Sequence, residues 1–224
     1  YKNNLIAGTH IALEAQAEIK MIRSKFFDRF LSGVRRMKKH LLALALIAAT
    51  GTANAAVMSY NFSNVEQTTE INQTGVLDLF DSTLGTLTSV SLILNGSMTT
   101  TIDLSHTSSG SASGRATGQV TLDFFTTLAG LDLSGATIDL TASTGNQTLA
   151  PNTVVSFGPL TDSDSVTLSP LTSLFSVAGG GTFGISCESL SGITALGFSG
   201  NANAVQTSSA TCGAEITYTY DAAP

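Results

Sequence analysis

Positive charge is almost absent from most of this sequence, because Arg115 is the only Lys or Arg between Ala56 and Pro224. Thirteen acidic residues in the same range leave it with a formal charge of −12. Proteins bind nucleic acid largely through Lys and Arg side chains that neutralise phosphates, and anionic membranes attract basic segments. The composition therefore argues against both nucleic acid and anionic membranes as partners.

Long apolar runs and Trp are also missing after residue 55. No stretch there approaches the ~20 apolar residues that a membrane-spanning helix needs, so we expect no membrane span in this part of the chain. The absence of Trp counts against a sugar-stacking platform, although Tyr60, Tyr218 and Tyr220 remain available.

The basic residues are concentrated in the first 55 positions, which hold nine of the ten Lys and Arg. Within this part, MKKHLLALALIAATGTANA (residues 37–55) has a basic start, a short apolar run and a small-x-small end. This order is typical of a secretory signal peptide, with cleavage between Ala55 and Ala56. A buried N-terminal helix is the alternative. We predict an upstream extension over 1–36 that is not part of the mature protein, a signal peptide over 37–55, and an exported domain over 56–224.

The sequence has only two cysteines, Cys187 and Cys212. In an exported domain two cysteines usually form a disulfide, and this one would stabilise the fold by roughly 3 kcal/mol in the chain-entropy model. Two buried free thiols are the alternative. A metal pair is disfavoured because no third Cys accompanies them.

Apolar and polar residues alternate with period two in several stretches after residue 55. Such alternation predicts strands with one buried and one solvent-facing side, as in antiparallel sheets. Turn signals separate these stretches, and no helical period is sustained. We predict one all-β domain, an antiparallel β-sandwich of the jelly-roll or immunoglobulin-like kind. The expected buried sides are Met58, Tyr60 and Phe62; Met98, Thr100, Ile102 and Leu104; Val120, Leu122 and Phe124; and Ile216, Tyr218 and Tyr220.

Two turn predictions fix the expected layout near the middle of the chain. Residues 82–85 predict a turn that leads from Phe80 into a strand, and Asn95-Gly96 between apolar alternations predicts a hairpin. The Ser/Gly-rich run 108–114 predicts a flexible loop tip.

His106, the only histidine after residue 55, lies close to Asp103 and Ser105. A nucleophilic serine needs a base and a group that orients the base. On a strand, however, Asp103 and Ser105 point to one face and His106 to the other. We therefore interpret His106 as a solvated loop histidine, and we expect no enzymatic activity and no catalytic residues.

Asp162-Ser163-Asp164 could begin a calcium site, because hard cations collect carboxylate oxygens from alternate loop positions. The stretch lacks the glycine and the terminal glutamate of a recognisable calcium loop. An acidic turn between strands is the ordinary interpretation, and Asp162 and Asp164 are the only candidate ligands. No other cofactor is expected.

Three stretches carry a family resemblance: residues 80–96 (FDSTLGTLTSVSLILNG), residues 156–185 (SFGPLTDSDSVTLS, then LTSLFSVAGGGTFGI) and residues 215–221 (EITYTYD). Together they resemble the choice-of-anchor E domain of exported bacterial proteins. The resemblance implies a surface or extracellular domain whose C-terminal anchor varies and is often a PEP-CTERM sorting tail. It brings no catalytic residues.

From these observations we expect a secreted or cell-surface, non-enzymatic β-sandwich of the extracellular matrix or envelope. A filament subunit is one alternative, in which Met58–Val65 or Ile216–Tyr220 would be an edge strand that joins a neighbour's sheet. A carbohydrate- or calcium-binding module is another, and its partner would be an extracellular polysaccharide.

Overall fold

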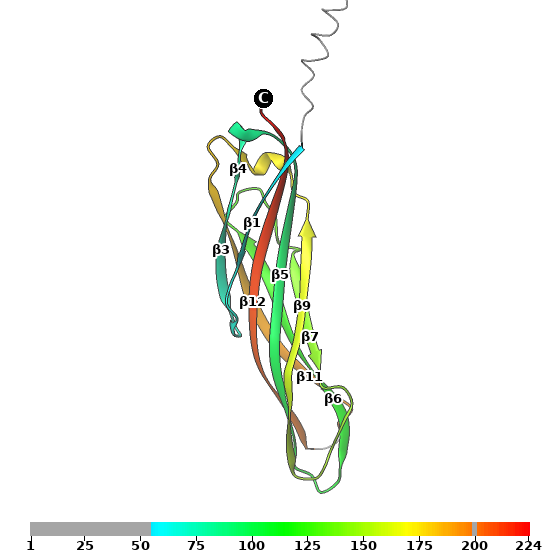
Figure 1. Ribbon diagram of the computed structural model, residues 1–224. Coiled ribbons are helices and arrows are strands. Elements are labelled where there is room, and N and C mark those ends of the chain that lie inside the picture. The colour runs from blue at the N-terminus through cyan, green and yellow to red at the C-terminus, as the bar shows by residue number, and fades with distance from the viewer. Residues whose placement is uncertain (1–54, 199–200) are drawn as a thin grey trace, which may run out of the picture. The chain divides into compact units, whose positions relative to one another are not determined.

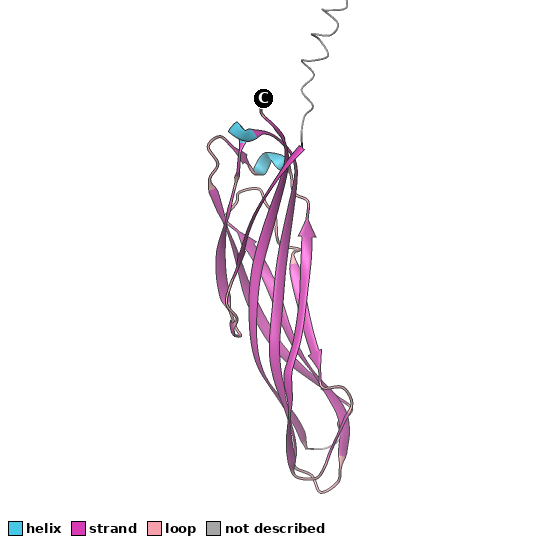
Figure 2. Ribbon diagram, viewed as in Figure 1, coloured by secondary structure: helices cyan, strands magenta, loops and turns pink. Residues whose placement is uncertain are grey.

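The computed structural model describes residues 55–198 and 201–224, and in them it confirms the predicted β-sandwich (Figures 1 and 2). The first sheet, sheet A, has the strand order β1 (Ala55–Ser63), β12 (Ala202–Ala222), β5 (Gly85–His106) and β9 (Thr153–Leu168), with β2 (Gln67–Thr68) also paired to β12. The second, sheet B, has the order β3 (Asn72–Asp78), β11 (Thr182–Leu196), β6 (Ala112–Thr126) and β7 (Thr137–Ser143), with β8 (Gln147–Leu149) also paired to β6.

Two small elements complete the described fold. A parallel pair joins β4 (Phe80–Asp81) to β10 (Ser176–Val177), whereas the other described pairings are antiparallel. Short 3₁₀ turns cover Ser82–Leu84 and Thr172–Leu174. The first lies where the sequence predicts the turn before β5. Among the residues that the structure describes, we find no helix long and apolar enough to cross a bilayer.

The core lies between the two sheets and follows the predicted alternation. Even-numbered residues of β5 face inward from Val90 to His106, while the odd-numbered ones are partly or fully exposed. The predicted inward residues of β6 and of β12 are likewise buried, except that Tyr220 is half-buried. On β1 the predicted residues Met58, Tyr60 and Phe62 are half-buried, because β1 lies at the edge of sheet A.

The hairpin prediction at Asn95-Gly96 is wrong, because both residues lie in the middle of the continuous strand β5. Gly96 is needed for packing between the sheets: a Cβ there would collide with Leu122 Cδ1 of β6. Leu94, Gly96 and Met98 all face the core, so every second residue is buried on both sides of Gly96. This is the pattern of one strand and not of two strands joined by a turn.

The structure corrects two further loop predictions. Residues 112–114 belong to β6, so the predicted Ser/Gly loop is limited to residues 107–111. Asp162-Ser163-Asp164 is not an acidic turn but part of β9, which pairs with β5.

Candidate functional site

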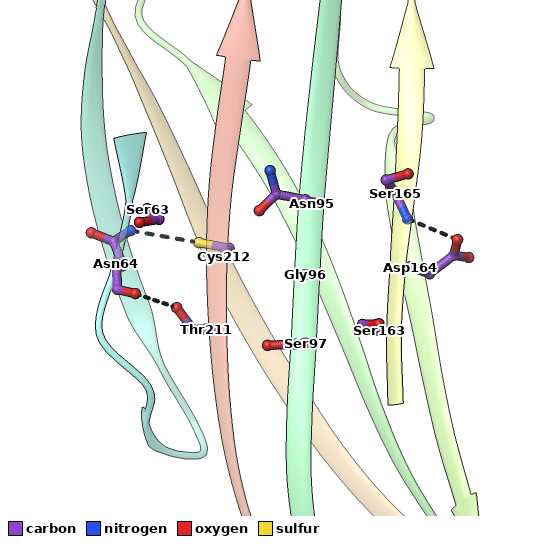
Figure 3. Close-up of a pocket in the computed structure, with 10 residues that line it drawn as sticks. All are labelled: Ser63, Asn64, Asn95, Gly96, Ser97, Ser163, Asp164, Ser165, Thr211 and Cys212. Atoms are coloured by element: carbon purple, nitrogen blue, oxygen red, sulfur yellow. Dashed lines mark hydrogen bonds between the residues drawn. The ribbon is translucent and has the colours of Figure 1, made fainter. Parts of the chain in front are cut away.

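A polar hollow of about 440 Å³ opens on sheet A and is lined by all four of its long strands or their ends (Figure 3). Gly213, which lies between the lining residues Asn95 and Ser63 in the strand register, has no side chain there. A Cβ on Gly213 would lie 2.7 Å from Asn95 Oδ1. The lining residues are Ser63, Asn64, Asn95, Gly96, Ser97, Ser163, Asp164, Ser165, Thr211 and Cys212.

Strand register brings these residues together from distant parts of the sequence. Gly213 of β12 is opposite Asn95 of β5 on one side and Ser63 of β1 on the other. Asn95 is in turn opposite Ser165 of β9. Thr211 and Ser97 form the adjacent row. Hydroxyl and amide groups thus line the hollow. Asp164 also borders it, but this residue is opposite the inward-facing Gly96, so its side chain lies on the other face of β9 from those of Ser163 and Ser165.

Internal hydrogen bonds hold the rim on the β1 side. The Asn64 N–H donates to the Cys212 carbonyl at 3.1 Å, and the Thr211 hydroxyl donates to the Asn64 carbonyl at 2.9 Å. On the opposite side the Ser165 N–H donates to Asp164 Oδ1 at 2.7 Å. The Asn95 amide is exposed in the hollow and makes no drawn bond to the other lining residues (Figure 3). The rim is therefore fixed, and the Asn95 amide can accept or donate to a ligand.

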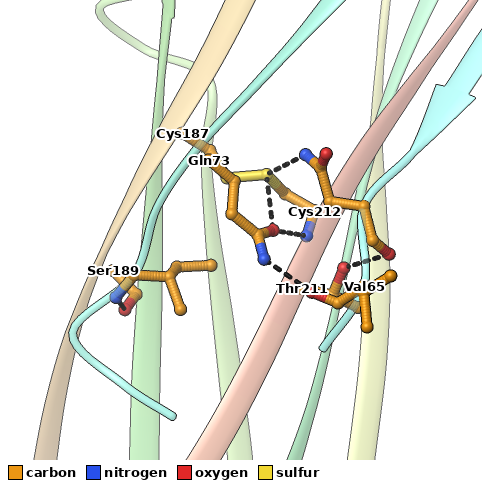
Figure 4. Close-up of a disulfide and its surroundings, with 8 residues drawn as sticks. Val65, Gln73, Cys187, Ser189, Thr211 and Cys212 are labelled. Atoms are coloured by element: carbon orange, nitrogen blue, oxygen red, sulfur yellow. Dashed lines mark hydrogen bonds between the residues drawn. A yellow bond between two sulfur atoms is a disulfide. The ribbon is translucent and has the colours of Figure 1, made fainter. Parts of the chain in front are cut away.

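The predicted disulfide between Cys187 and Cys212 is confirmed, and it joins β11 of sheet B to β12 directly beside the hollow (Figure 4). Both cysteines are buried. The Gln73 side chain supports the bridge: its Oε1 accepts from the Cys212 N–H at 3.1 Å, and its Nε2 donates to the Val65 carbonyl at 2.7 Å. The floor of the hollow is thus tied to the second sheet.

The two candidate calcium ligands, Asp162 and Asp164, lie two positions apart on β9. Asp162 Oδ2 accepts from the Thr141 N–H of β7 at 2.8 Å, so this carboxylate bridges the edges of the two sheets. In the described ranges, no group of three or more His, Cys, Asp or Glu could hold a metal ion. Calcium binding at Asp162 and Asp164 stays a prediction, which melting temperatures with and without calcium would test.

His106 is not a solvated loop histidine, which corrects the sequence interpretation. It ends β5 with its side chain inward and only 2% exposed, and its Nε2 lies 2.7 Å from the Gly110 carbonyl oxygen. Asp103 and Ser105 face the opposite side of the strand, as expected. The structure therefore does not bring these three side chains together, and His106 anchors the loop that follows β5.

The pKa values of Asp81 and Tyr218 are shifted for structural reasons. Hydrogen bonds from the backbone and side chain of Thr83, and from the Gly179 N–H, lower the pKa of Asp81, which caps the 3₁₀ turn at Ser82–Leu84. Burial raises the pKa of Tyr218, whose hydroxyl donates to the Asp78 carbonyl at 2.8 Å. Both groups stabilise the fold through these hydrogen bonds, and neither is a lining residue of the hollow.

The predicted cleavage site lies at the boundary of the described residues. Ala55 and Ala56 are the first two residues of β1 and pair with Asp221 and Tyr220. The predicted upstream extension and the rest of the signal peptide lie outside the described residues.

Comparison with known proteins shows no matching family model and no matching curated protein. Solved structures match weakly. The infectious bursal disease virus Gx strain structure has 13% identity and a TM-score of 0.17, and the match covers 76% of this chain and 37% of that one. The infectious bursal disease virus VP2 subviral particle structure has 13% identity and a TM-score of 0.20, and the match covers 76% of this chain and 38% of that one.

The Desmodium yellow mottle tymovirus structure gives 8% identity and a TM-score of 0.20, covering 76% of this chain and 90% of that chain. This chain thus spans little more than a third of the two infectious bursal disease virus chains that it matches. At these TM-scores the similarities carry no argument about function.

Proposed function

We propose that this chain is an exported, non-enzymatic domain of the cell surface or extracellular matrix, of the choice-of-anchor E kind. The observation that carries the proposal is the buried disulfide between Cys187 and Cys212. Disulfides form and persist in oxidising compartments outside the cytosol, and the basic and apolar leader over 37–55 supplies a route of export.

Expression of residues 1–224 in a bacterial host with a working secretion pathway tests this proposal. We expect a processed protein whose N-terminus is Ala56, found at the cell surface or in the medium, with no free thiol in denaturant. Replacing Lys38 and Lys39 by Glu should block processing, because the basic start of a signal peptide is needed for its recognition. Unprocessed protein with two free thiols, confined to the cytosol, would contradict the proposal.

The polar hollow favours a second candidate function, the binding of a neutral polysaccharide. Its hydroxyl and amide groups can donate to and accept from sugar hydroxyls, and no lining residue carries a positive charge. The lining also lacks aromatic side chains, so binding would depend on hydrogen bonds without ring stacking. We therefore expect weak affinity for one sugar unit and useful affinity only for a chain.

Two matched double variants test polysaccharide binding. Asn95 and Ser165 are directly opposite each other in the hollow, while Asn203 and Ser105 form a similar Asn–Ser pair elsewhere on sheet A. Affinity electrophoresis in gels with neutral polysaccharides should show retardation of the wild type. Asn95→Ala/Ser165→Ala should weaken it about tenfold, at about 0.5–1.5 kcal/mol per lost hydrogen bond. The control Asn203→Ala/Ser105→Ala should bind like the wild type, and equal losses in both variants would remove the hollow as the site.

A further inference from the structure

The two edges of sheet A, β1 and β9, differ in how they resist pairing with another strand. The β9 edge contains Pro159, which has no N–H, and its register with β5 shifts near this residue. It also carries Asp162 and Asp164, and the Asp162 carboxylate accepts a hydrogen bond from the Thr141 N–H at the neighbouring edge of sheet B. Proline, irregular register and inward-pointing charges are the usual means by which sheet edges avoid unwanted pairing.

The β1 edge has none of these features. Its sequence, AAVMSYNFS, contains no charged residue and no Pro, and in the described part of the chain β1 pairs only with β12. Val57, on its solvent side, is 66% exposed. A nine-residue uncharged edge of this kind is a ready template for strand addition.

The hydrogen-bond pattern shows which groups of β1 are free. Asn64, directly after β1, donates its N–H to the Cys212 carbonyl, so this carbonyl faces the β1 side of β12, although the Cys212 N–H donates to Gln73 Oε1. Hydrogen-bonded and non-hydrogen-bonded pairs alternate along an antiparallel ladder. The even-numbered residues of β1 therefore bond to β12. The N–H and C=O groups of the odd-numbered residues Val57, Ser59 and Asn61 point away from it.

We propose that β1 is the contact strand of a homodimer, in which it pairs antiparallel with β1 of a second copy across a two-fold axis at Ser59. In this register Ser59 is opposite Ser59 of the second copy, and Val57 is opposite its Asn61. All paired residues are odd-numbered, so the free groups of both copies meet. Ser59 is also the midpoint of Ala55–Ser63, and of 56–62 in a chain that begins at Ala56, so the paired length is maximal in both.

This arrangement gives a closed dimer, in which each copy uses its β1 edge once, and it does not continue into a filament. Ile216–Tyr220, one of the two edge segments expected from the sequence, is not an edge, because β12 lies between β1 and β5. A polymer built through sheet A would need a second open edge of that sheet to accept β1, and its other edge, β9, is protected against pairing. An edge that pairs with its own copy gives an isologous dimer.

The dimer would also bring two polar hollows onto one surface. Pairing between residues of the same parity keeps the outer faces of both copies of sheet A on one side. A polysaccharide chain could then contact both hollows and gain from multivalency. This consequence alone rests on the proposed polysaccharide binding, and the dimer itself does not.

Cysteine cross-linking tests the contact directly. In a hydrogen-bonded antiparallel pair the two Cα atoms at the axis are about 5.5 Å apart, within the range that a disulfide spans. Ser59→Cys in the full chain should therefore form a covalent dimer under mild oxidation. Thr167→Cys is the control, because Thr167 is also an exposed residue of an edge strand of sheet A, on β9. Equal cross-linking of the two variants would overturn the proposal.

Sedimentation equilibrium gives an independent test with no new thiol. The wild type should show a concentration-dependent monomer–dimer equilibrium and no larger species. Ser59→Pro removes a free N–H at the axis without removing a bond to β12, so it should weaken dimerisation at least about tenfold. Ser59→Lys should also weaken dimerisation, and the matched control Thr167→Lys on the β9 edge should leave it unchanged. A wild type that is monomeric at millimolar concentration, or that forms open polymers, would overturn the proposal.

Discussion

The two ends of the sandwich have very different cores. At one end, which we call the aromatic end, Phe80, Phe175, Phe183, Tyr218 and Tyr220 form a connected group of rings, with centroids 4.9 Å apart for Phe80 and Tyr220 and 5.5 Å for Phe175 and Phe183. At the other, the distal end, the separate buried cluster consists of Ile102, Leu104, Ala116 and Leu149. His106 lies beyond it, with a buried Nδ1 that has no hydrogen-bond partner among the described residues.

This difference suggests that the stability of the domain is concentrated at the aromatic end. Aromatic side chains bury large areas, and paired rings contribute about 0.5–1.5 kcal/mol beyond that area. The distal cluster is small and borders the loops at residues 107–111 and 144–146. Regions with few buried apolar contacts open locally at low free energy cost. We therefore expect amide exchange at the distal end to be faster than at the aromatic end.

The largest expected effect comes from a cavity at the aromatic end. Phe175 is fully buried between Phe183 and Tyr218, and its carbonyl accepts from the Phe80 N–H at 2.9 Å. Phe175→Ala should lower the free energy of unfolding by about 3–5 kcal/mol. Leu104→Ala at the distal end should cost about 2 kcal/mol, the low end for such changes, because the surrounding loops can relax into the space. Urea unfolding measures both, and equal costs would contradict the proposed difference between the ends.

Removing the disulfide should lower stability by about 3 kcal/mol, because the bridge closes a 25-residue separation. Cys187 and Cys212 belong to the same large core cluster as the aromatic residues. The double variant Cys187→Ala/Cys212→Ala should therefore raise amide exchange more at the aromatic end than at the distal end. The control is the wild type in reducing agent, which should keep its disulfide until it unfolds because both sulfurs are buried. Loss of order at the distal end alone would show that the two ends are not separately stabilised.

A matched pair of glycine substitutions compares the large core with an open surface. Gly96→Ala places a methyl group against the buried Leu122 side chain and should cost about 1–3 kcal/mol. Gly192 lies on β11 with no atom within 4 Å of an added Cβ. Gly192→Ala should be neutral or stabilise by up to about 1 kcal/mol, because it restricts the unfolded chain. Equal melting temperatures for the two variants would show that β5 and β6 can separate at Gly96.

The sequence predicts the strands better than it predicts their partners. Alternation identifies the inward residues of β5, β6 and β12, because burial of one face of a sheet is a local property of each strand. The Asn95-Gly96 hairpin was wrong because a short-range turn signal competed with packing across the sheets, and Leu122 lies 26 positions away. The sequence signal for one long strand was the alternation from Leu92 to Leu104, which keeps the same phase on both sides of Gly96.

The candidate site could not be predicted because it depends on register. Ser63, Asn95, Ser165 and Gly213 are ordinary solvent-side residues of four strands, and only the pairing of those strands aligns them. Nothing in the sequence near any one of them differs from the many other polar alternations. His106 was misinterpreted for a related reason: its inward parity on β5 was visible, but the polar loop that follows it suggested solvent exposure.

The smallest expected effect concerns the hydroxyl of Tyr218, which connects the aromatic end of sheet A to sheet B. Tyr218→Phe removes the bond to the Asp78 carbonyl and should cost about 1 kcal/mol near neutral pH. The same variant should change the response to alkali. Burial raises the pKa of Tyr218 above the ordinary value of 10.0, so above about pH 10 the unfolded chain releases a proton that the folded chain keeps.

Because the pKa of Tyr218 is higher in the folded than in the unfolded chain, its contribution to the free energy of unfolding is fully present below the unfolded-state pKa. This contribution is lost as the pH rises above that value. The wild type should therefore lose stability between about pH 10 and pH 11, and Tyr218→Phe should lose less over the same interval. Tyr220→Phe, which keeps Tyr218, serves as the control and should retain the full alkaline loss. Urea midpoints at pH 8 and pH 10.8 measure these differences. If the distal end is the weaker region, its protection against amide exchange, relative to the unfolded chain at the same pH, should be low and the same in both proteins. Protection near Tyr218 should fall at high pH only in proteins that retain its hydroxyl. An alkaline loss of the same size in Tyr218→Phe would show that another group couples the aromatic end to pH.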